Sequence, residues 1–69
     1  MFYFEVKGLY GRTWGMGAFI SSYDEAVSRA EAAADDYLAA WWLPRTAFIT
    51  VRTIGEKGFT EWHWEVSNN

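Results

Sequence analysis

The sequence predicts an α+β fold in which a four-stranded antiparallel sheet carries one helix across one face. Residues 21–42 form a single helical pattern, and two pairs of alternating apolar segments flank it, 2–7 with 13–20 and 46–54 with 59–66. Glycine-containing connectors join the two members of each pair, as in β-hairpins. Two hairpins separated by one helix favour an antiparallel sheet with one covered face.

Residues 21–42 carry the signals of one helix. Ser22 stands three positions before Glu25, so each side chain can accept a hydrogen bond from the other's backbone N–H in a capping box. The preceding serine offers a similar cap one residue earlier. Seven alanines and the absence of interior Gly or Pro favour helix. Pro44 disfavours helical backbone in the residue before it, so we expect the helix to end near residues 41–42.

The predicted helix has an apolar stripe and an acidic flank, because successive helical residues are about 100° apart. The stripe should pack on the sheet and contains Tyr23, Val27, Ala30, Ala34, Leu38 and Trp41, with Ala26 and Tyr37 beside it. One flank carries Asp24, Glu31 and Asp35. We expect Trp42 on the same flank, where an exposed indole beside carboxylates would suit a partner interface. The alternative is that Trp42 covers the end of the sheet beside Leu43 and Pro44, and Trp14 is grouped with Trp41 and Trp42 as a candidate contact surface.

Alternation in the strand segments predicts one face against the helix and one face open to solvent. The covered face should contain Phe2, Phe4, Val6, Ile49, Val51, Trp62 and Trp64. The open face should contain Tyr3, Glu5, Lys7, Phe48, Thr50, Arg52, Glu61, His63 and Glu65. Strand order 2-1-3-4 makes every neighbouring pair antiparallel and is favoured, with 1-2-3-4 as the alternative.

Segment 13–20 is expected at an edge of the sheet. One face should carry its larger residues, which are Trp14, Met16, Ala18 and Ile20. Gly15 and Gly17 alternate opposite them. Two glycines weaken a strand and often mark a bulge. They also leave a strip without side chains, onto which a neighbouring aromatic ring or a partner could settle.

The negative charge is concentrated on the predicted helix. The formal charge of the chain is −3, and residues 21–42 hold five acids and one base. An acidic face repels phosphate backbones, which disfavours direct nucleic-acid binding. It attracts a basic protein surface instead. The alternative is a solvated helix face that serves solubility.

Length and composition indicate one domain, residues 1–69, without cofactor or metal. The absence of Cys excludes disulfides and thiolate sites, and a single His excludes a histidine cluster. Five Trp, five Phe and four Tyr are more than one small core face comfortably holds, which predicts an exposed recognition surface or a face shared by two copies. The alternative is that several of them lie half-buried at the sheet margins. Neither a signal-peptide pattern nor an apolar run of the about 20 residues that span a bilayer is present, so we expect no membrane contact and a cytoplasmic location.

Glu61, His63 and Glu65 form the one pattern that suggests enzyme chemistry. Spacing of two on a strand points all three side chains the same way. A carboxylate beside an imidazole can tune a general base or contribute metal ligands. All three face solvent without a predicted pocket, so the favoured interpretation is a charged outer face, and the chain is predicted not to be an enzyme.

The layout resembles small phage-encoded inhibitors of the anti-CRISPR kind: a hairpin, one capped acidic helix and a second hairpin in 69 residues without Cys. The resemblance implies a non-enzymatic protein that occupies a surface of a host nucleic-acid-binding machine. We expect partner contacts through Asp24, Glu31, Asp35 and Trp42, with Tyr3, Phe48 and Arg52 of the open face. The alternative is a structural homodimer or assembly component that pairs through the open sheet face.

Overall fold

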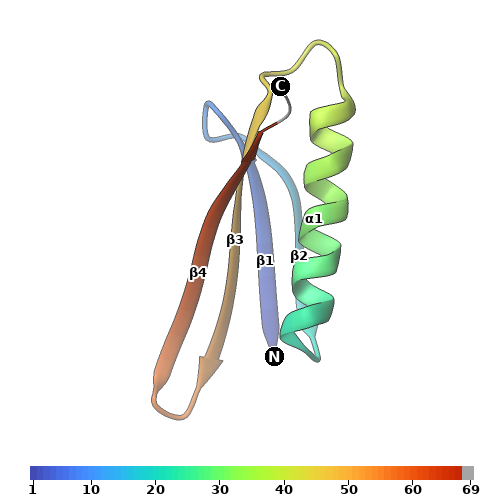
Figure 1. Ribbon diagram of the computed structural model, residues 1–69. Helices are drawn as coiled ribbons and strands as arrows, with labels where there is room; N and C mark the ends of the chain where they lie inside the picture. The colour runs from blue at the N-terminus through green and yellow to red at the C-terminus, as the bar shows by residue number, and fades with distance from the viewer. Residues whose placement is uncertain (68–69) are drawn as a thin grey trace.

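Four strands and one helix alternate as β-β-α-β-β in the computed structural model, which describes residues 1–67 (Figure 1). The elements are β1 (Phe2–Gly8), β2 (Thr13–Ile20), α1 (Tyr23–Ala39), β3 (Thr46–Gly55) and β4 (Gly58–Ser67). The strands form one antiparallel sheet in the order β2-β1-β3-β4. The predicted α+β fold and the favoured strand order are confirmed.

The helix begins at the predicted cap but ends earlier than predicted. Ser22 has extended backbone angles, and its side chain accepts a hydrogen bond from the backbone N–H of Glu25 at 3.1 Å. At the other end, Ala40 is the C-cap and its N–H donates to the Tyr37 carbonyl. The Leu43 N–H then donates to the Ala40 carbonyl, which closes a turn over residues 40–43. The predicted end near residues 41–42 is wrong, because this turn reverses the chain toward β3 before the constraint of the proline is reached.

The buried stripe of α1 is centred on small residues. Ala26, Ala30, Ala34 and Tyr37 are the buried residues of the helix. The larger members of the predicted stripe, Val27 and Leu38, are half-buried at its margin, while Tyr23 is exposed. Trp41 lies outside the helix and is 86% exposed, so its predicted place in the core is wrong. Alanines at the centre let the helix backbone approach the sheet closely, and this close approach leaves bulky side chains only the margins.

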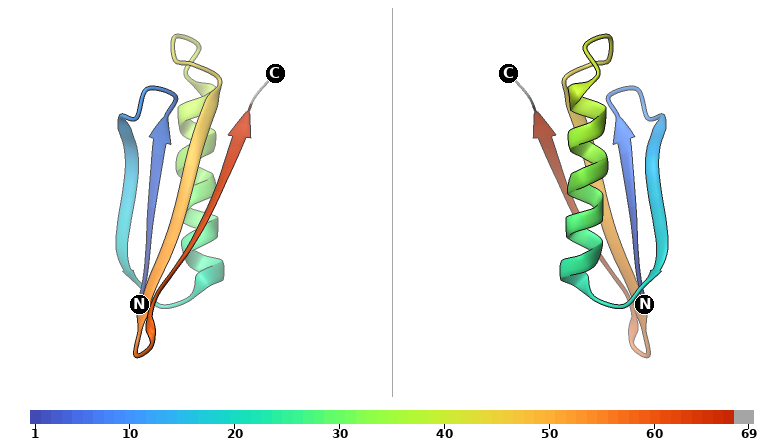
Figure 2. Two further views of the ribbon diagram at one scale, coloured as in Figure 1. Left: turned by 90° about the vertical axis from the view of Figure 1, so that its left-hand side faces the viewer. Right: turned by 90° about the vertical axis from the view of Figure 1, so that its right-hand side faces the viewer.

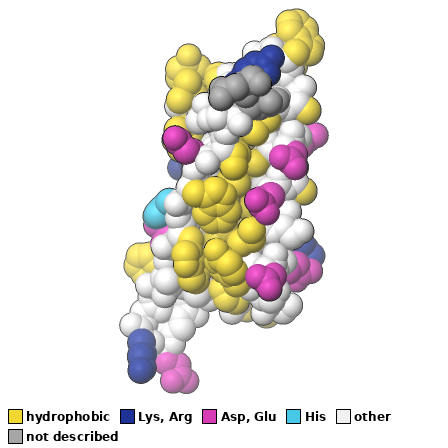
Figure 3. Space-filling view, in the orientation of Figure 1, with side chains coloured by type: hydrophobic (Ala, Val, Ile, Leu, Met, Phe, Trp, Pro, Cys, Tyr) yellow, Lys and Arg dark blue, Asp and Glu magenta, His cyan; other side chains and the backbone are white. Residues whose placement is uncertain are grey.

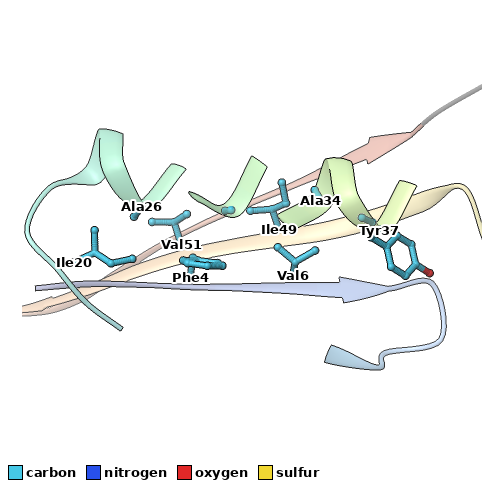
Figure 4. Packing of buried hydrophobic residues seen from close by; sticks show 10 residues of the cluster. Phe4, Val6, Ile20, Ala26, Ala34, Tyr37, Ile49 and Val51 are labelled. Atoms are coloured by element: carbon cyan, nitrogen blue, oxygen red, sulfur yellow. The ribbon is translucent and has the colours of Figure 1, made fainter. Parts of the chain in front are cut away.

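The covered face of the sheet supplies the rest of the core. Its buried residues are Phe4, Val6, Ile20, Ala47, Ile49 and Val51. Figure 4 shows these side chains meeting the alanines of α1, with Tyr37 at one end of the cluster. The predicted inward alternation of β1 and β3 is confirmed. The largest fully buried side chains are Ile49, Val6 and Val51, and burial of a Val or Ile side chain is worth about 1.5–3 kcal/mol.

Two register shifts interrupt the alternation of β2. Gly15 and Gly17 pair with core residues of β1 and therefore face the helix side. The Phe4 ring lies against Gly17 so closely that a Cβ there would collide with it, which confirms the predicted strip for an aromatic. Phe19 has φ 60°, and the chain bulge at this point turns Ile20 into the core while Met16 stays 71% exposed. The prediction that Met16 and Ile20 share a face is therefore wrong.

The helix covers only part of the sheet. It packs on β1, β2 and β3, and β4 lies at the far edge (Figures 1 and 2). The molecule is elongated, 42 × 19 × 17 Å, and the tip of the β3–β4 hairpin projects beyond the start of the helix (Figure 2). Within the described part of the chain, α1 is neither long nor apolar enough to cross a lipid bilayer.

Candidate partner-binding surfaces

The residues predicted to contact a partner lie on three separate surfaces. They divide into an α1 group of Asp24, Glu31 and Asp35, the connector residue Trp42, and an open-face group of Tyr3, Phe48 and Arg52. The first group lies on the side of the helix that faces β4, and the last lies on the sheet face that α1 leaves uncovered. The structure therefore does not bring the predicted site together as one surface.

Three carboxylates of α1 form what we call the acidic flank: Asp24, Glu31 and Asp35. All three are exposed, and none has an ion pair or hydrogen bond to another side chain of residues 1–67. The other two acids of the helix are engaged. Glu25 pairs with Arg29 at 3.3 Å, and Asp36 accepts a hydrogen bond from the Trp14 indole at 3.2 Å. The carboxylates of α1 that have no side-chain partner among residues 1–67 thus all lie on the flank beside β4.

An apolar strip lies next to the acidic flank, where side chains of α1 and β4 face one another. Its members are half-buried or exposed side chains of α1 and β4, namely Tyr23, Val27, Leu38, Trp62, Trp64 and Val66. Tyr23 and Trp62 mark one end, with ring centroids 4.8 Å apart. At the other end, a depression of about 340 Å³ separates Leu38 from Val66 and has Asp35 on its rim. Figure 3 shows the apolar band with acidic side chains along its helix side.

Trp42 lies away from the acidic flank, which contradicts its predicted position. The indole is 63% exposed and lines a pocket of about 370 Å³ at the end of the molecule where the β1–β2 loop meets the α1–β3 connector (Figure 1). The other lining residues are Gly8, Tyr10, Arg12, Thr13, Trp14, Tyr37, Leu43 and Pro44. Because α1 ends at Ala39, the turn that follows carries Trp42 toward β2, at the opposite edge of the sheet from β4.

The sequence groups Trp42 with Trp14 and offers a place beside Leu43 and Pro44 as the alternative for Trp42, which agrees with this pocket, but it does not predict the contribution of Tyr10, Arg12 and Tyr37. Trp14 and Tyr37 meet edge to face inside it, with centroids 5.4 Å apart. Tyr10 and Arg12 come from a loop that the sequence marks only by its glycines. Their approach to the connector depends on tertiary packing, and the one local signal is the clustering of aromatic residues near both chain reversals.

The open face combines paired charges with exposed apolar side chains. Arg52 donates to Glu61, with Nη2 to Oε2 at 2.8 Å, so its guanidinium is neutralised within the chain. Tyr3 is half-buried, and Phe48 is 38% exposed. The sequence did not single out Phe19, which is 76% exposed and lies with its ring centroid 6.1 Å from that of Tyr3.

The Glu61–His63 pair belongs to this open face. His63 Nε2 lies 2.7 Å from Glu61 Oε1, and Nδ1 lies 3.3 Å from the Thr50 hydroxyl. Both ring nitrogens therefore have a neighbour on the same flat, exposed surface. No group of three His, Asp or Glu side chains among residues 1–67 is placed to hold a metal ion. An exposed pair of this kind contributes at most about 1 kcal/mol to stability.

Comparisons of the chain with protein-family models, with curated proteins and with solved structures gave no significant match.

Proposed function

We propose that this chain is a non-enzymatic, protein-binding inhibitor that docks its acidic flank and apolar strip onto a basic surface of another protein. The observation that carries the proposal is the distribution of side-chain partners among the carboxylates of α1. Glu25 pairs with Arg29 and Asp36 accepts a hydrogen bond from the Trp14 indole, whereas Asp24, Glu31 and Asp35 have no side-chain partner among residues 1–67 and lie directly beside half-buried or exposed apolar side chains.

The two parts of this surface have different tasks. The acidic row from Asp24 to Asp35 is about 16 Å long at 1.5 Å per residue, and it would attract a basic surface and speed the encounter. The apolar strip would supply affinity once water is excluded, because aromatic side chains are common energetic centres of interfaces. The acidic row alone would bury little apolar surface, and the apolar strip alone would not attract a basic partner.

A basic surface that normally holds nucleic acid is the target that this charge fits best. Carboxylates can occupy the Lys and Arg side chains that otherwise contact phosphates. The resemblance of the layout to anti-CRISPR proteins names one such target, and with it we propose that the protein acts in the cytoplasm of a bacterial host as a phage-encoded inhibitor that blocks a CRISPR-Cas complex.

Cleavage of target DNA by a panel of purified CRISPR effector complexes tests this function. Addition of the protein should inhibit one of them, and the inhibition should weaken as salt rises because exposed charges are screened. The double variant Glu31→Lys/Asp35→Lys should lose inhibition by about tenfold or more. The control Glu56→Lys/Glu65→Lys makes the same charge change at the hairpin turn and on the open face, and it should inhibit like the parent. Equal loss in both variants would contradict a role for the acidic flank.

A structural homodimer is the second candidate, and the exposed apolar residues of the open face favour it. Met16 and Phe19 are 71% and 76% exposed there. Two open faces could pack as a sandwich with the helices outside. Sedimentation of the pure protein across a concentration series distinguishes the candidates, since a tight dimer supports assembly and a monomer at all concentrations removes it.

A further inference from the structure

The β4 strand is a long, regular and uncovered sheet edge. It pairs with β3 from Thr46↔Ser67 to Gly55↔Gly58 without a register shift. The opposite edge strand, β2, has two register shifts, one of which is the bulge at Phe19. Proteins normally protect edge strands with bulges, very short strands or a covering element, because the outer N–H and C=O groups can pair with another chain. Within residues 1–67, only one of the two edges of this sheet has such protection.

The side chains along this edge would also support an added strand. Trp62, Trp64 and Val66 point to the helix side of the sheet and are half-buried. The helix packs on the other three strands, so the outer flank of these side chains is left without a neighbouring strand. A strand added beside β4 would place its alternate side chains about 5 Å from them, within direct packing distance.

Charge selects the kind of strand that fits. The helix runs alongside β4 from Tyr23, which contacts Trp62, to Leu38, which faces Val66 across the depression. The acidic flank therefore follows the same line as the indoles. Basic side chains on an added strand could lie on the faces of Trp62 and Trp64 and point toward these carboxylates, a combination of cation–π and ion-pair contacts.

A second copy of the chain suits this edge poorly. Pairing β4 with β4 of a second copy would bring two acidic flanks toward one another and would also place Glu61 and Glu65 near their counterparts. Like charges across neighbouring strands are destabilising. The same charges favour a basic segment of a different protein.

We propose that β4 accepts an extended segment of a basic protein as a fifth strand, antiparallel to β4 as in every other neighbouring pair of the sheet, with Arg or Lys at alternate positions facing the helix side. This inference rests on the proposed function and names the partner segment that the acidic flank and apolar strip recognise. Main-chain pairing would give affinity, and the alternate basic side chains would give specificity.

Synthetic peptides of about seven residues, the length of an ordinary strand, test the proposal on the intact protein. The first alternates Thr and Arg, and its matched control has the same composition with the Arg residues in one block. Binding followed by tryptophan fluorescence at low salt should be at least about tenfold tighter for the alternating peptide. Equal affinity would show attraction by charge alone and would overturn strand addition.

Backbone N-methylation makes the test specific for main-chain pairing. Successive N–H groups of a strand point to opposite edges, so methylation of the Thr amides and methylation of the Arg amides block different edges of the peptide. One methylated peptide should lose binding by about tenfold or more, and the other should bind nearly as the parent. Equal behaviour of the two methylated peptides would overturn the proposal.

Two further outcomes separate this inference from the proposed function. Failure of the alternating peptide to bind at about 1 mM would overturn strand addition, while inhibition that is sensitive to Glu31→Lys/Asp35→Lys would leave the acidic-flank function standing. A dimer in sedimentation that dissociates when Trp64→Lys is introduced would show that a second copy occupies β4, and it would also overturn the proposal.

Discussion

The indole nitrogen of Trp14 donates a hydrogen bond to Oδ2 of Asp36 at 3.2 Å, which joins the β2 edge of the sheet to the helix across 22 positions of sequence. The same indole packs edge to face on Tyr37. One carboxylate of α1 is thereby committed to holding the fold, whereas its sequence neighbour Asp35 faces the depression near β4. Adjacent acids of one helix thus have different tasks.

Asp36→Ala should therefore destabilise the fold more than Asp35→Ala. Loss of a hydrogen bond of this kind costs about 0.5–1.5 kcal/mol, and the exposed Asp35 has no such bond among residues 1–67. Urea unfolding followed by tryptophan fluorescence measures both variants. Equal free energies of unfolding for the two would show that the bond to Trp14 contributes nothing in solution.

The close contact between Phe4 and Gly17 predicts a strong effect of a single methyl group. A Cβ at Gly17 would collide with the Phe4 ring, so Gly17→Ala should lower the free energy of unfolding by about 1–3 kcal/mol through overpacking. Adding Phe4→Leu to the Gly17→Ala variant should recover part of the lost free energy of unfolding, because the smaller side chain leaves room for the new methyl group. A double-mutant cycle measures the coupling. Additive effects of the two substitutions would contradict a direct clash.

The helix start distinguishes two serines that the sequence leaves as alternatives. Ser22 accepts from the Glu25 N–H at 3.1 Å, while the Ser21 hydroxyl makes only a 3.5 Å contact with the Glu25 side chain. Ser22→Ala should cost about 1 kcal/mol, and Ser21→Ala should cost a few tenths at most. Thermal unfolding followed by circular dichroism compares them. A larger loss for Ser21→Ala would place the cap one residue earlier.

Much of the fold follows from local signals, which explains the success of the sequence prediction there. The Ser22–Glu25 cap is a local arrangement. Phe4 and Val6 occupy alternate positions of β1, and this spacing directly indicates which face of the strand is buried. Trp41 and Ile20 were placed wrongly for a different reason. Their positions depend on a turn and on a bulge whose formation is decided by packing between distant segments.

The candidate site was harder to predict than the fold, for a related reason. The sequence shows that Asp24, Glu31 and Asp35 share a side of α1, because helical spacing alone sets that relation. The sequence does not show that α1 packs mainly on β1, β2 and β3 and leaves an apolar strip between these carboxylates and β4. That arrangement depends on how closely the alanines let α1 approach the sheet. Trp42 was grouped with the acids only because the helix was expected to continue to residues 41–42.

Phe19 combines an unfavourable backbone with an exposed side chain, and its replacement should stabilise the protein. The residue has φ 60°, a conformation that costs a non-glycine residue about 1 kcal/mol, and its side chain is 76% exposed. Phe19→Gly should therefore raise the free energy of unfolding by up to about 1 kcal/mol, less the packing lost against Tyr3. Phe59→Gly is the matched control, because Phe59 is 67% exposed in β4 without a positive φ, and glycine there should destabilise the strand. Urea unfolding of both variants should thus give changes of opposite sign, and destabilisation by both would mean that the Phe19 ring contributes more to the fold than its backbone strain costs.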